Sequence, residues 1–125
     1  MDPSPESDPL ASVESLLEII TLAHAAIYTA HRRLIDLDAD DEESRQLLQE
    51  SVEIVFSKAP EVGRRARELA AEWGARQLLD PSAAPSVLAA AEKEAGHAER
   101  ALRRLLRRQE GIATRLRARS DEAAG

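Results

Sequence analysis

Apolar residues recur at alternating steps of three and four along the first third of the chain. The positions of this seam are Leu10, Val13, Leu17, Ile20, His24, Ile27, His31 and Leu34. Such spacing predicts one long helix that buries a single stripe of side chains. At two of these positions, His24 and His31 place imidazoles where the core of a helical bundle ordinarily has leucine or isoleucine.

Helix-start signals divide the rest of the chain. Asp8 followed by Pro9 is a suitable cap for the first helix. Ser57 and Ser82 each stand three residues before a proline, whose missing N–H does no harm in the first turn of a new helix. These signals predict an all-α, up-down four-helix bundle. The predicted helices cover about 9–36, 41–56, 58–79 and 83–119, with Asp40 and Glu43 capping the second.

A three-helix bundle is the alternative. One apolar seam keeps its phase straight through Pro60, and it consists of Leu48, Val52, Val55, Ala59, Val62, Ala66, Leu69 and Trp73. This continuity predicts one long middle helix, kinked at Pro60. We place the four-helix bundle first because a proline inside a helix costs ~3 kcal/mol.

Length and composition indicate one helical domain. The chain has 125 residues, of which 43% are hydrophobic, 32% charged and 2% aromatic, and this balance is typical of helices. We expect an extended leader over residues 1–8, a single domain over 9–119 and a frayed tail over 120–125. The chain has no cysteine, and neither a secretory signal nor a membrane-spanning run is evident, so we expect a soluble, cytoplasmic protein.

The two ends of the chain differ in charge. Residues 1–53 contain thirteen acids and three bases, whereas residues 100–119 contain eight of the 17 basic residues. We expect these regions to attract each other. Because the net charge is −6 and no aromatic residues are interleaved with the arginines, nucleic acid is not an expected partner, and neither is a membrane.

Small side chains dominate the predicted core at the level of His24. They include Ala66, Ala70, Ala95 and Ala98. Such a layer either closes or leaves a void, and a void the size of one leucine side chain costs ~2.7 to 5 kcal/mol unless it is filled. A closed layer would bury imidazoles without obvious partners, at ~1 to 3 kcal/mol for each group. We therefore expect a small-molecule ligand in this layer.

Three kinds of ligand fit this layer. Haem or another planar ligand could use His24, His97 or both as axial ligands, and a small organic molecule could form hydrogen bonds with His24, His31 or Tyr28. Zinc ranks third because His24 and His31 lie ~10.5 Å apart along a helix axis. No catalytic residue is assigned, since no triad or phosphate-binding loop is present. The predicted binding residues are His24, His97, His31, Tyr28, Ala66, Ala70, Ala95 and Ala98.

Simpler interpretations exist for the same residues. His24 and His31 could be core histidines bonded to neighbouring groups, His97 could lie at the surface, and Gln109 could fix the register of the last helix. The alternative function is therefore a structural or self-associating interaction module without a ligand, as a monomer or a homodimer. The face expected to self-associate consists of Leu10, Val13, Leu16, Leu17, Leu105, Leu106, Ile112 and Leu116.

The style of the chain is regular throughout. Unbroken heptads, helix starts that combine Asp or Ser with Pro, and an acidic leader rich in Pro and Ser extend over its length. In these features the chain resembles a de novo designed helical bundle. Four glycines inside predicted helices depart from that style, since each costs up to ~1 kcal/mol relative to alanine. The resemblance implies that they give clearance to a bound molecule. They are Gly63, Gly74, Gly96 and Gly111.

Overall fold

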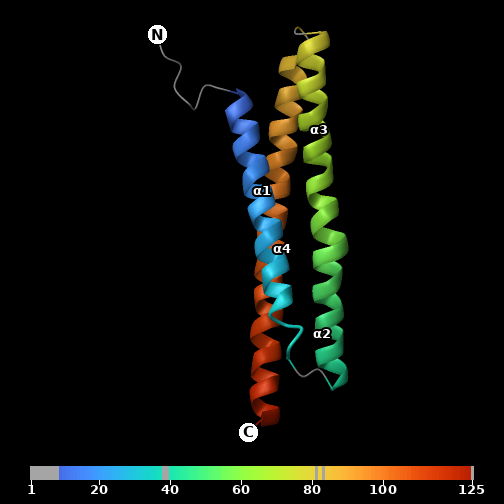
Figure 1. Ribbon diagram of the computed structural model, residues 1–125, viewed down its shortest axis with the longest axis vertical. Helices are drawn as coiled ribbons and strands as arrows, with labels where there is room; N and C mark the ends of the chain where they lie inside the picture. The colour runs from blue at the N-terminus through green and yellow to red at the C-terminus, as the bar shows by residue number, and fades with distance from the viewer. Residues whose placement is uncertain (1–8, 38–39, 81, 83, 125) are drawn as a thin grey trace.

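Three long helices pack side by side (Figure 1). The computed structural model describes residues 9–37, 40–80, 82 and 84–124, and all regular structure within them is helical. α1 (Pro9–Arg32) and α4 (Ala84–Ala124) run in the same direction, and the middle helix runs opposite to them. The middle helix consists of α2 (Glu42–Glu53), the π-helical turn η2 (Ile54–Lys58) and α3 (Ala59–Leu79). The fold is therefore an all-α bundle of three helices.

The middle helix passes through Pro60 without a break. At η2 the Ala59 N–H donates to the Ile54 carbonyl five residues back, so the turn is wider than an α-turn. Ala59, directly before the proline, keeps right-handed helical angles, φ −66° and ψ −46°. We attribute the continuity to this wide turn, because in a regular α-helix the proline ring and its missing N–H would cost ~3 kcal/mol. The four-helix prediction is not confirmed, and the three-helix alternative agrees with the structure.

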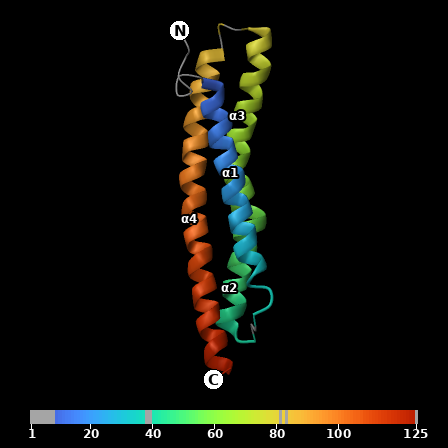
Figure 2. The ribbon, with the colours of Figure 1, turned by 60° about the vertical axis from the view of Figure 1, so that its left-hand side comes forward.

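The predicted apolar seams form most of the core, but Val52 of the middle-helix seam is 43% exposed. α4 packs closely against both α1 and α3, whereas α1 approaches the middle helix at fewer positions. Figure 2 shows α4 extending along almost the whole length of the bundle. α4 is therefore the helix around which the others are arranged. Each leucine or isoleucine side chain that is buried in this core adds ~1.5 to 3 kcal/mol to the free energy of unfolding. The fully buried residues of α1 and α4, with the turn after α1, include Ile20, Ile27, Leu34, Leu102, Ile112 and Leu116.

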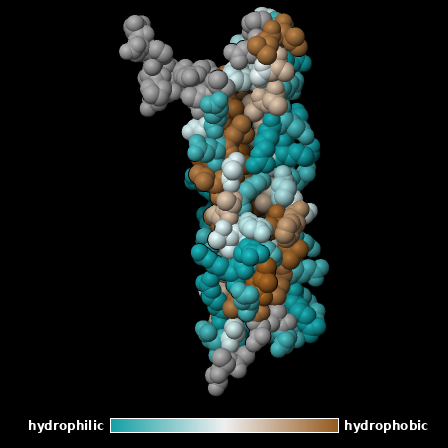
Figure 3. Space-filling view, viewed as in Figure 1, coloured by the Kyte–Doolittle hydropathy of each residue, from teal (hydrophilic) through white to brown (hydrophobic). Residues whose placement is uncertain are grey.

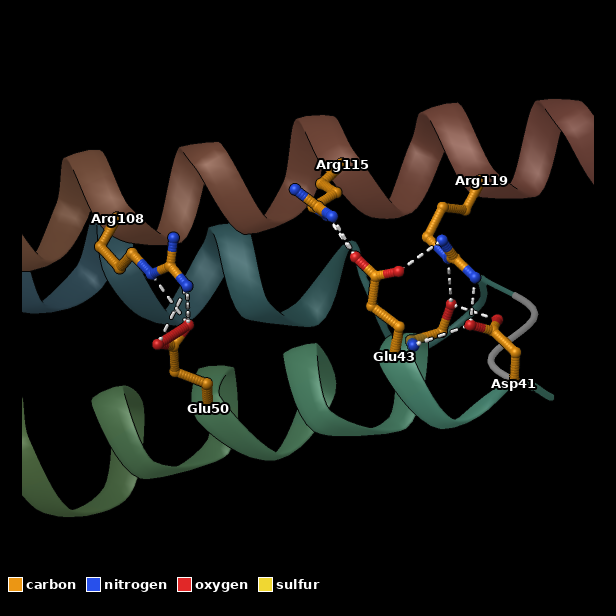
Figure 4. Close-up of polar contacts among 7 residues, drawn as sticks. Asp41, Glu43, Glu50, Arg108, Arg115 and Arg119 are labelled. Atoms are coloured by element: carbon orange, nitrogen blue, oxygen red, sulfur yellow. Dashed lines mark hydrogen bonds and ion pairs between the residues drawn. The ribbon is translucent and has the colours of Figure 1, made fainter.

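Ion pairs join the acidic start of the middle helix to the basic end of α4 (Figure 4). Arg108 lies 2.7 Å from Glu50, and Arg119 lies 2.7 Å from Glu43. The Nε of Arg115 also donates to Glu43, at 2.6 Å. The expectation that the oppositely charged regions attract each other is confirmed by these contacts.

Asp41 caps the start of α2, one residue after the predicted cap. Its Oδ2 accepts the Ser44 backbone N–H at 3.2 Å, its Oδ1 accepts the Ser44 hydroxyl at 2.6 Å, and Arg119 also donates to it. These hydrogen bonds, with that from the Ser44 hydroxyl the strongest, lower the pKa of Asp41 to about 2. The carboxylate therefore stays charged at neutral pH and holds the start of α2 against the end of α4.

The sequence predicted an extended leader at the start of the chain and a frayed tail at its end. The predicted leader, residues 1–8 with its Asp8 cap, lies outside the described residues. The predicted frayed tail begins at residue 120, but α4 continues as a helix to Ala124.

One described segment is apolar enough to cross a membrane by length and composition alone. It is Val13–Arg32, and no such run was expected. A core helix of a soluble protein passes the same test, but only 17% of the apolar window is buried inside the bundle, with Ile20 and Ile27 among its buried residues. The segment is therefore weak evidence for a membrane span.

Candidate functional site

A buried polar cluster connects all three helices. Ser51 on the middle helix lies 2.8 Å from Nδ1 of His31 on α1, and its hydroxyl accepts the Nε2 amide hydrogen of Gln109 on α4 at 2.5 Å. All three side chains are buried. Because the Ser51 oxygen accepts from Gln109, its own proton is free to point at Nδ1 of a neutral imidazole.

The environment of His31 favours the neutral ring. Burial, and to a lesser extent the nearby positive charge of Arg32, lowers the pKa of His31 below its ordinary value of 6.5. Gln109 keeps one unused group, since its Oε1 is buried and has no hydrogen-bond partner among the described residues. The cluster therefore fixes how the three helices align with one another.

Ser51 was absent from the predicted site. The signal that could have indicated it is the spacing of Ser44 and Ser51, seven residues apart, which places both hydroxyls on one face of the middle helix. Both are fully buried in the structure. Serines at a heptad spacing on an otherwise apolar face indicate buried partners on the neighbouring helices, here Arg119 for Ser44 and His31 for Ser51.

His24 lies against a glycine of the middle helix. A Cβ added at Gly63 would lie 3.2 Å from Cε1 and Nε2 of the His24 ring and 3.2 Å from Nη1 of Arg67. The His24 Nε2 is buried and has no hydrogen-bond partner among the described residues. Burial first, and the charge of Arg67 second, lower the pKa of His24 below 6.5, against a smaller opposite effect of the Ala59 carbonyl. His24 is therefore a neutral ring with one unused nitrogen.

The small residues at this level lie in the core. Ala66, Ala95 and Ala98 are buried and belong to the same continuous core as Ile20 and Ile27. Five surface hollows on the described part of the bundle do not have His24, His31 or His97 in their walls. A ligand inside this layer stays a prediction.

The remaining predicted binding residues are dispersed. His97 is exposed on α4, Tyr28 is exposed on α1, and Ala70 is half-buried. Within the described residues, no three His, Asp or Glu side chains are grouped closely enough to hold a metal ion. The structure therefore does not bring the three histidines together in one site.

A patch of exposed apolar side chains surrounds the outer edge of His31. The His31 and Phe56 rings meet edge to face, with centroids 5.9 Å apart and an interplanar angle of 89°. Helical spacing places Tyr28 beside His31 and Val52 beside Phe56, and Ile35 lies in the turn that follows α1. We call Tyr28, Ile35, Val52 and Phe56 the Phe56 patch; their exposed fractions are 46%, 57%, 43% and 64%.

The space-filling view shows this region from outside. Apolar residues gather along the boundary between α1 and the middle helix, on the face seen in Figure 3. In the face that was expected to self-associate, Val13, Ile112 and Leu116 are buried in the core, whereas Leu16, Leu17, Leu105 and Leu106 are only partly buried. The side chain of Leu10 lies outside the described residues. Self-association through that face stays a prediction.

Comparison with known proteins finds no match: no family model, no characterised protein and no solved structure is similar to this chain.

Proposed function

We propose that this protein is a helical interaction module that self-associates through the Phe56 patch. The observation that carries the proposal is the exposure of four large apolar side chains around the His31–Phe56 contact. Apolar patches of this kind mark interaction sites, and aromatic residues are enriched at the centres of interfaces. Because Phe56 packs on a ring held by Ser51, the patch is presented in a fixed shape.

The charges beside the patch are suited to a second copy of the same chain. Arg32 lies three residues before Ile35, and Glu53 lies three residues before Phe56. Both are exposed, and neither forms an ion pair with another described residue. In a two-fold symmetric dimer every contact between the two copies occurs twice, so Arg32 of each copy could pair with Glu53 of the other.

The interior of the bundle favours the same function. Ala66, Ala95 and Ala98 are buried in one continuous core, which supports a stabilising and aligning role for the interior. The buried apolar positions of α1 belong to that core, which supports a soluble module.

Site-directed cross-linking tests the proposal, because the natural chain contains no cysteine. A single Val52→Cys variant places a thiol in the patch, and Leu22→Cys places one on an exposed position of α1 outside it. We expect Val52→Cys to form disulfide-linked dimers faster than Leu22→Cys under mild oxidation. Equal and slow cross-linking of both variants would contradict the proposal.

A small organic molecule or a haem-like cofactor at His24 is the second candidate. It is favoured by one observation, the buried Nε2 of His24 that has no partner among the described residues. Titration with haem is the test, with a shift of the Soret band expected for the natural protein and its loss in His24→Ala. A His97→Ala variant is the control, since that ring is exposed on α4. No shift in the natural protein would exclude the haem version.

A further inference from the structure

The exposed arginines of α4 differ in whether they form ion pairs with another helix. On the flank that faces α2, Arg108, Arg115 and Arg119 each pair with a carboxylate of the middle helix (Figure 4). Elsewhere on α4, the exposed arginines Arg100, Arg107 and Arg117 form no ion pair with any described residue, and neither does Arg33, which directly follows α1. Arg103 pairs with Glu99 of α4 itself, at 2.6 Å. α2 therefore supplies carboxylates to one group of arginines, and no described helix supplies them to the other.

Two adjoining hollows lie beside these arginines, one between α1 and α4 and one lined by residues of α4 alone, and we call them together the groove. One hollow of about 520 Å³ lies between α1 and α4 and includes Arg33 and Arg117 in its wall. A second hollow, of about 450 Å³, lies further along α4 and includes Arg100 and Arg107. The two share Leu106 and Glu110, so they adjoin.

The floor of the groove is made of small and apolar side chains. Ala26 and Ala30 contribute from α1, and Leu106 and Ala113 contribute from α4. Small residues allow another helix backbone to approach closely. From Arg100 to Arg117 the groove spans ~25 Å at the helical rise, enough for a helix of about 17 residues. Its shape and length therefore fit a fourth helix.

We propose that this groove binds an acidic, amphipathic helix of another protein. The chain's own α2 shows the chemistry required: it packs beside α4 and meets arginines with Glu43 and Glu50, seven residues apart. A partner with apolar residues on one face and glutamates beside them would repeat that arrangement with Arg107 and Arg117. This surface is separate from the Phe56 patch, so the proposal goes beyond self-association.

The apolar floor separates this partner from a nucleic acid. A phosphate backbone would use the arginines alone, while Ala26, Ala30 and Leu106 would gain nothing from it. The groove also contains one acid, Glu110, which would repel phosphates and glutamates alike. We expect Glu110→Gln to strengthen binding of the acidic helix.

Fluorescence anisotropy with the full chain tests the proposal. The probe is a labelled peptide of three heptads with leucine and alanine on one face and glutamate beside them, and the matched peptide has glutamine in place of glutamate. We expect the acidic peptide to bind at least about tenfold more tightly, and the difference to shrink at high salt. Equal binding of the two peptides, or binding of neither, overturns the proposal.

Variants test the arginine charges and the open space of the groove one at a time. Arg107→Glu with Arg117→Glu should weaken binding at least about tenfold, and so should Ala26→Trp, which fills the groove but keeps every arginine. Arg65→Glu with Arg76→Glu, an equal charge change on exposed α3, should leave binding unchanged. A DNA duplex that binds more tightly than the acidic peptide would overturn the proposal. Phe56→Glu should not affect peptide binding. A failure of the groove proposal can therefore be distinguished from a failure of self-association through the Phe56 patch.

Discussion

The His24 ring occupies the space that a side chain at Gly63 would need. The Cβ of an alanine there would lie 3.2 Å from two atoms of the ring, closer than ordinary van der Waals contact. This relationship explains why a helix tolerates glycine at this position, despite a cost of up to ~1 kcal/mol relative to alanine. Gly63 thus gives clearance to a residue of the same chain.

Replacement of Gly63 by alanine should reveal this contact. In the natural chain we expect Gly63→Ala to lower the free energy of unfolding, because the His24 ring must shift. In a His24→Ala background the same change should raise it by about 1 kcal/mol, the gain in helix propensity. Urea denaturation of the double-mutant cycle measures the coupling. Gly74→Ala is the control, since a Cβ there meets nothing within 4 Å, and it should stabilise in both backgrounds. Additive effects of Gly63→Ala and His24→Ala would contradict the contact.

The Ser51 hydroxyl should contribute more to stability than an exposed serine does. Ser51→Ala leaves the buried Nδ1 of His31 and the amide of Gln109 without their partner, so we expect a loss of ~1 to 3 kcal/mol. Ser57→Ala, at an exposed position of the same helix, should change the free energy of unfolding by no more than about 0.5 kcal/mol. Chemical denaturation compares the two. Similar small effects would mean that the cluster is not hydrogen-bonded in solution.

Stability should fall as the pH is lowered from about 7.5 to about 5.5. The pKa values of His24 and His31 are lowered in the folded state, so the unfolded chain takes up protons first, near the ordinary value of 6.5. The free energy of unfolding is therefore highest above that pH and decreases below it, until the folded-state pKa values are reached. Each unit of pKa difference corresponds to about 1.4 kcal/mol.

Variants of the histidines assign this pH dependence. His24→Gln or His31→Gln should flatten the decrease, whereas His97→Gln, at an exposed position, should leave it unchanged. Urea midpoints at the two pH values are the measurement. A decrease that persists in the His24 and His31 double variant would mean that other groups cause it.

The helix should be continuous through Pro60. We expect the amides of residues 55–59 and 61–63 to exchange with solvent as slowly as those of α2 and α3, because η2 keeps the backbone hydrogen-bonded up to the proline. Pro60→Ala should keep this protection and should not lower the helical content measured by circular dichroism. Fast exchange confined to residues 56–59 would indicate two separate helices.

Much of the fold could be predicted from the sequence because it depends on periodicity. The seams through Ile20 and Ile27 and through Leu102 and Ile112 are buried as their spacing predicts. Pro60 was misjudged because the cost of proline assumes an α-turn, and a single π-turn changes which backbone groups need partners. Local turn geometry of this kind has no signature in the apolar pattern.

The site was harder to predict because it depends on which residues meet. The sequence indicated that His24 and His31 face the core, but their neighbours come from other helices. Ser51 and Gly63 lie on the middle helix, and their contacts with the imidazoles depend on the relative register of two helices. The state of the small-residue layer also depends on the separation of the helices, which the apolar pattern does not give, because small residues let helices approach.

Sedimentation velocity across a range of protein concentration tests the central claim most directly. From about 1 μM to about 1 mM we expect the natural chain to pass from monomer to dimer. Phe56→Glu should remain monomeric throughout, and Leu22→Glu, which places the same charge at an exposed leucine outside the patch, should dimerise like the natural chain. A natural chain that stays monomeric at every concentration, or a Phe56→Glu variant that dimerises equally well, would contradict self-association through the Phe56 patch.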